Sequence, residues 1–84
     1  MTLVERAGTV RTREDLVAFL GAFSADFVTN RAAWTHTDLA SFLDAMAAWS
    51  QDMEGFYDNG GESSASISPW RVPTDILMAA RVYE

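Results

Sequence analysis

The chain has 84 residues, of which 49% are hydrophobic and 12% aromatic, and it contains no cysteine. A chain of this length has interior for one core only, so we expect a single domain spanning residues 1–84. The apolar and aromatic content excludes a disordered chain. The absence of cysteine excludes disulfides, thiolate metal sites and cysteine nucleophiles.

Charge is distributed unevenly along the chain. Twelve acids against six arginines give a net charge of −6, yet residues 32–70 contain six of the acids and no Lys or Arg. Such a charge repels phosphate backbones and anionic lipid, so we expect neither nucleic acid nor a membrane as a partner. No apolar run reaches the roughly 18 to 20 residues of a membrane helix, and residues 1–11 lack the apolar core of a signal peptide, which predicts a cytoplasmic protein.

Helical periodicity predicts two helices in the first third of the chain. A short one is expected over about residues 3–8, where apolar residues recur at helical spacing behind a threonine, a common capping residue. A second is expected over about residues 13–28, with Thr12 and Asp15 as an approximate capping box and Asn30 as its stop. Its predicted core stripe is Leu16, Phe19, Leu20, Phe23 and Phe27.

A third helix is expected over about residues 38–58. Thr35 or Thr37 is its predicted cap, and Asp38 in the first turn would interact favourably with the helix dipole. The segment 60–68 reads as a loop of small polar residues. The predicted core stripe of this helix is Leu39, Phe42, Leu43, Met46, Trp49, Met53 and Phe56, with Trp49 at the centre of the core.

The last helix is expected over about residues 73–83, because Pro73 is tolerated without loss only in the first turn of a helix. We expect Arg81 to hold this helix down through Asp52 or another acid of the third helix. No segment alternates polar and β-branched residues as a strand would. The fold class is therefore all-α, a compact bundle of three main helices with the short N-terminal helix added.

Three strings of the sequence form a recognisable pattern: SFLDAMAAW, DMEGFY and WRVPTDILMAARVYE. The most specific part pairs an AAWxxDMxGxY segment with a C-terminal WRxxxDILxAARVYE segment. In this respect the chain resembles a family of small bacterial domains of unknown function over about residues 12–84, with departures from the pattern at His36 and Pro73. The resemblance implies a helical fold and offers no activity, cofactor or catalytic residue.

The residues themselves offer no recognised catalytic or metal-binding motif, so we expect a protein that is not an enzyme and uses no cofactor or metal. His36 is the only histidine, and no patterned nucleophile accompanies it. Asp52 and Glu54 lie in an acidic run without calcium-loop spacing, and on a helix they point to different faces. A carboxylate-metal enzyme around this pair is the least favoured hypothesis.

The leading hypothesis is a non-catalytic protein-interaction module whose acidic helical surface binds another protein with a basic surface. The predicted interaction surface consists of Asp38, Asp44, Asp52, Glu54, Tyr57, Asp58, Trp70 and Arg71. An immunity-type protein, which masks the basic active site of a toxin, is a special case that rests on size and charge. The alternative is a homodimer or larger homo-oligomer with structural function, in which one or two of the aromatic residues lie at the subunit interface.

Overall fold

A computed structural model describes residues 2–61 and 67–83 and confirms the all-α class. Those ranges contain four α-helices, one 3-10 helix and no strand. In chain order the elements are α1 Leu3–Gly8, α2 Arg13–Thr29, the 3-10 helix η1 Arg31–Ala33, α3 Leu39–Asn59 and α4 Arg71–Ala80. The first three predicted helices therefore agree with α1, α2 and α3 to within one residue at each end. Most of the predicted loop, residues 62–66, lies outside the described residues.

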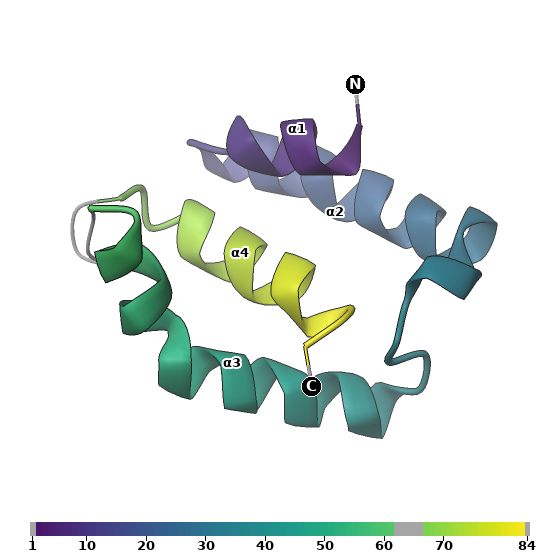
Figure 1. The fold of residues 1–84 in the computed structure, drawn as a ribbon. Coiled ribbons are helices and arrows are strands. Elements are labelled where there is room, and N and C mark those ends of the chain that lie inside the picture. Colours follow the sequence, from purple (N-terminus) through teal and green to yellow (C-terminus); the bar gives the residue numbers. More distant parts are fainter. Residues whose placement is uncertain (1, 62–66, 84) are drawn as a thin grey trace.

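The last helix in the sequence, α4, is the central element in space (Figure 1). It lies between the α1–α2 pair and α3, and it packs against all three of these helices. Every residue of α4 is buried or half-buried, as expected for a helix with neighbours on several sides. The molecule measures 33 × 27 × 17 Å, so its smallest dimension holds at most two layers of helices, each about 10 Å across.

The start of α3 is set by Asp38, whose side chain accepts a hydrogen bond at 2.9 Å from the backbone N–H three residues later. The capping role expected of Thr35 or Thr37 is therefore wrong. The reason lies in the other end of the chain, because the N–H groups of Thr35 and His36 both donate to the carbonyl of Arg81, at 2.8 and 3.1 Å. These contacts hold the segment before α3 in a non-helical conformation.

The last helix is longer than expected at its start and shorter at its end. It begins two residues before Pro73, so this proline lies in the first turn, as predicted. It ends at Ala80 instead of Tyr83. The N–H groups of Val82 and Tyr83 both donate to the carbonyl of Ala79, which closes the helix in a tightened final turn.

The main core gathers aromatic side chains from α2, α3 and the connection between them. Phe19 and Phe23 of α2 are buried, with Phe19 fully inaccessible. Trp34, from the connection, is 7% exposed, and its ring centroid lies 4.8 Å from that of Phe23 and 5.0 Å from that of Phe27. It also stacks on Phe42 of α3, at 5.8 Å with an interplanar angle of 23°. Trp34 thus joins two helices that pack chiefly against other elements.

A second buried cluster lies on the face of α3 that packs against α4. Trp49 and Tyr57 are 7% and 4% exposed, which confirms the predicted core position of Trp49. Three members of the predicted stripe are wrong, because Leu39, Leu43 and Phe56 are 73%, 51% and 55% exposed. The exposure of Leu39, at the start of α3, is consistent with length, since α3 has 21 residues and its main packing partner α4 has 10. Length does not explain Phe56, because the next residue, Tyr57, is buried and bonds to α4.

Candidate interaction surface

The eight residues predicted as an interaction surface separate into two groups. The five acids are all exposed and lie along α3 or at its N-terminal cap: Asp38, Asp44, Asp52, Glu54 and Asp58. The other three lie where α3 and α4 approach each other: Tyr57, Trp70 and Arg71. The acidic group has the character of a surface, whereas part of the second group is internal.

Two of the five acids have roles within the fold. Asp38 caps α3, and hydrogen bonds from Ser41 hold the pKa of its carboxyl below the usual value. Asp52 accepts a hydrogen bond from the hydroxyl of Tyr83. The remaining three side chains have no hydrogen-bond or ion-pair partner within residues 2–61 and 67–83, and they are Asp44, Glu54 and Asp58.

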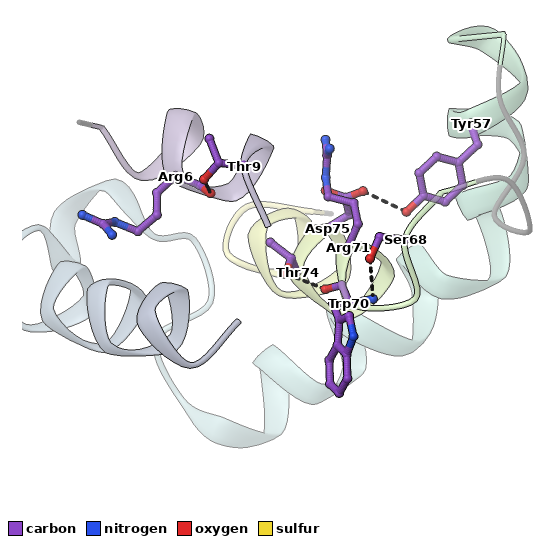
Figure 2. Close-up of polar contacts among 8 residues, drawn as sticks. All are labelled: Arg6, Thr9, Tyr57, Ser68, Trp70, Arg71, Thr74 and Asp75. Carbon is purple, nitrogen blue, oxygen red and sulfur yellow. Dashed lines mark hydrogen bonds and ion pairs between the residues drawn. The ribbon is translucent and has the colours of Figure 1, made fainter. Parts of the chain in front are cut away.

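Tyr57 is buried and belongs to the contact between α3 and α4, which corrects its assignment to the surface (Figure 2). Its hydroxyl donates to Oδ2 of Asp75 at 2.9 Å, while Nε of Arg71 donates to Oδ1 of the same carboxylate at 2.9 Å. Burial, with the adjacent carboxylate, raises the pKa of Tyr57 well above its ordinary value. Trp70 is 37% exposed, and in Figure 2 its indole points away from the Tyr57–Asp75 pair.

These polar groups line a cavity of 340 Å³ together with Phe56. The raised pKa keeps Tyr57 protonated, so it acts as a hydrogen-bond donor rather than as a base. Asp75 already accepts from two neighbours, one of them the cationic Arg71. Among the described residues that line it, the cavity therefore presents no side chain placed to act as a nucleophile or general base.

The Tyr57–Asp75 contact predicts a loss of stability in alkaline solution. Because the pKa of Tyr57 is raised in the folded state, its contribution is complete below the unfolded value of about 10 and is lost as pH rises above it. We expect the urea midpoint to be constant up to about pH 10 and to fall from there to about pH 12. Tyr57→Phe, which retains Tyr83 as the remaining tyrosine, should show a smaller fall. An equal fall in both proteins would contradict the assignment.

The acid that pairs with Arg81 lies on α2, not on α3 as expected. The guanidinium of Arg81 lies 3.6 Å from Oδ2 of Asp26 and 5.8 Å from the ring centroid of Trp34. Asp26 also accepts the indole N–H of Trp34 at 2.8 Å. Hydrogen bonds from Trp34 and Asn30 lower the pKa of Asp26. The predicted clamp therefore exists with a different partner, and it fixes the position of Trp34.

An apolar groove between α2 and α3 is a feature that the sequence analysis missed. Its centre is a cavity of 270 Å³ whose lining includes Phe27, Leu39 and the stacked pair Trp34 and Phe42. The carboxylate residue Asp38 lines the same cavity. The lining of this cavity therefore combines aromatic side chains, an exposed leucine and a carboxylate.

Exposed leucines lie one or two helical turns from residues that line this cavity. Leu43 follows Leu39 by one helical turn and is 51% exposed, and Leu20 precedes Phe27 by two turns on α2 and is 43% exposed. Residues 16–25 of α2 include no charged residue. That charge-free stretch is the sequence feature that could have predicted an apolar contact surface on α2, because an exposed helix face without charge is typical of such a surface.

Two further observations bear on the classes of function. Within the described ranges, no three His, Cys, Asp or Glu side chains lie close enough together to hold a metal ion, so the carboxylate-metal hypothesis gains no site there. No helix in those ranges combines the length and apolar character needed to cross a membrane.

Fold and surface together define a small all-α domain that bears an acidic helix beside an apolar groove. The chain belongs to the family of unknown function DUF7660, whose model matches residues 12–84. No match was found among curated proteins or among solved structures. The matched range is the one over which the resemblance was expected, and the family assigns no activity to the chain.

Proposed function

We propose that this protein is a non-catalytic interaction module that binds a protein with a basic surface through the exposed acids of α3. The observation that carries the proposal is the one-sided charge of this segment. Residues 32–70 contain six acids and no Lys or Arg, and Asp44, Glu54 and Asp58 are exposed without a charge partner among the described residues. A field of one sign steers an oppositely charged protein into contact and speeds association.

The arrangement of the acids supports a role outside the fold. Glu54 and Asp58 are four residues apart on α3, where like charges destabilise a helix by about 0.2 to 0.5 kcal/mol. No basic side chain of α3 offsets this cost. A cationic partner would offset it on binding. An immunity-type protein, which covers the basic active site of a toxin, is one form that such a module could take.

The test is the rate of association with the protein that co-purifies from the native cell. We expect the combined variant Asp44→Asn, Glu54→Gln and Asp58→Asn to remain folded, because these side chains are exposed. Its association should be about tenfold slower at low salt, with a weaker salt dependence than that of the wild type. Dissociation should change little, since exposed charges act mainly on the encounter. Interferometry across a salt series measures both rates.

The matched control is Glu14→Gln on α2, which removes an exposed acid remote in sequence from α3. Its association rate should remain within about twofold of the wild-type rate. An association rate at low salt that is the same for the combined variant and the wild type would contradict the proposal. In that case the acids would serve solubility, and the variant would precipitate more readily.

A further inference from the structure

We propose that the groove between α2 and α3 receives one amphipathic helix of the partner. A large apolar side chain of that helix enters the cavity above Trp34, and a Lys or Arg side chain lies beside Asp38. This inference rests on the proposed function and specifies the chemistry of the partner. Its first support is the size of the cavity: 270 Å³ lies below the roughly 300 to 1,000 Å³ of small-molecule sites and suits a single side chain.

The walls of the groove indicate which kind of segment it accepts. Leu39 lines the cavity, and Leu43 follows it by one turn on α3, so the two form an exposed ridge. On α2, the exposed Leu20 precedes the cavity-lining Phe27 by two turns and marks the second ridge. A helix about 10 Å wide presents anchors at i, i+3, i+4 and i+7 and can contact two such ridges at once. An extended strand needs an exposed sheet edge, and the described residues contain no strand. The aliphatic ridges therefore favour a helix.

Charge favours a basic partner over a second copy of this chain. Asp38 lines the cavity, and α3 carries acids and no base. The two arginines beside the lining aromatics already have partners, because Arg31 lies over the ring of Phe27 and Arg81 pairs with Asp26. If α3 of a second copy entered the groove, acids would lie against acids, and like charges across an interface cost several kcal/mol. If α2 entered instead, its charge-free stretch at residues 16–25 would leave Asp38 without a counter-charge. A helix with Leu on one face and Lys on the other meets both requirements.

A defined probe tests the inference directly. The probe is a synthetic helical peptide with leucines at i, i+3, i+4 and i+7 and lysines elsewhere. Two comparison peptides replace Lys with Glu or scramble the order so that no apolar face forms. Binding is measured by fluorescence anisotropy, and the indole N–H signal of Trp34 is followed by NMR. We expect the Leu/Lys peptide alone to bind and to shift the Trp34 signal.

Substitutions of the two leucines on α3 give a quantitative test of how much this ridge contributes to peptide affinity. Leu39→Ser and Leu43→Ser alter exposed side chains and should leave the fold intact. Each should weaken binding of the Leu/Lys peptide about tenfold or more, because a truncated anchor residue at an interface costs at least about 1.4 kcal/mol. The matched control is Val4→Ser on α1, where Val4 is 67% exposed, and its affinity should stay within about twofold of the wild-type affinity.

Several results would overturn the inference: equal binding by the two Leu→Ser variants and the wild type, equal binding of the Glu peptide, or a dimer in sedimentation that Leu39→Ser abolishes. The experiments distinguish a wrong assignment of the groove from a wrong proposed function. If Leu39→Ser associates with the co-purified partner as the wild type does while the triple acid variant associates slowly, only the proposed role of the groove is contradicted. If the triple acid variant associates normally while Leu39→Ser weakens binding, the proposed role of the acids is contradicted and the proposed role of the groove is supported.

Discussion

Replacing Trp49 by alanine is expected to lower the free energy of unfolding by about 3 to 5 kcal/mol. Trp49 is 7% exposed at the centre of α3, and its ring packs 5.5 Å from Phe56 and 6.3 Å from Tyr57, measured between centroids. A domain of 84 residues has a total stability of about 4 to 12 kcal/mol, so the variant would retain little of it. Urea denaturation followed by far-ultraviolet circular dichroism measures the change.

The matched control for this prediction is Phe56→Ala. Phe56 lies two turns further along α3 in the same predicted stripe but is 55% exposed. Its removal should cost about 1 kcal/mol, because more than half of the residue's surface stays in contact with water in the folded protein. Equal losses of unfolding free energy in the two variants, or an unchanged urea midpoint for Trp49→Ala, would show that burial does not determine how much each aromatic ring contributes to stability.

Replacing Trp34 by alanine is expected to cost a similar amount, about 3 to 5 kcal/mol, for a different reason. Trp34 joins α2 to α3 through its contacts with Phe27 and Phe42. It also donates its indole N–H to Asp26, which would lose that donor. Denaturant unfolding should therefore show a large fall in the midpoint, and a variant as stable as the wild type would exclude Trp34 as the joint between the two helices.

Trp34→Phe separates the hydrogen bond from the packing. Phenylalanine retains an aromatic ring but removes the donor to Asp26, which should cost about 1 to 3 kcal/mol. The pKa of Asp26 is lowered in the folded state, so its contribution is present above the unfolded value of about 3.9 and is lost as pH falls through the folded value. Trp34→Phe should lose less stability than the wild type between about pH 6 and about pH 2. The same loss in both proteins would contradict this role.

Local signals in the sequence were sufficient to place the helices. Thr12 caps α2 as expected by accepting the N–H of Asp15, and Pro73 lies in the first turn of α4. The reciprocal half of the expected capping box is not formed, because the carboxylate of Asp15 accepts from the N–H of Arg11. The cap of α3 and the end of α4 could not be predicted in the same way. The segment before α3 donates to the carbonyl of Arg81, which lies 45 residues after His36, and α4 ends in a turn that closes on the carbonyl of Ala79. Periodicity describes one helix at a time and holds no information on such contacts.

The candidate site was predictable to a similar extent. The acids of α3 follow from composition alone, since the segment has no base. The groove does not, because it depends on Trp34 bringing together α2 and α3. The exposure of Leu39 also could not be predicted, because it depends on the shorter length of α4. Relative helix lengths decide which apolar residues of a regular stripe remain in contact with water.

The central position of α4 has a consequence for how the chain folds. α3 packs chiefly against α4, and α1 contacts both α2 and α4. Until α4 docks, the other three helices therefore lack the one helix that all of them contact. That docking must close a loop of about 40 residues between α2 and α4, and the entropy of closure is lost before the contacts of α4 offset it. The Trp34 cluster joins α2 to α3 without α4, but α3 gains its main packing partner only when α4 docks. The transition is therefore expected to be slower than in a bundle of sequential hairpins and to be all-or-none.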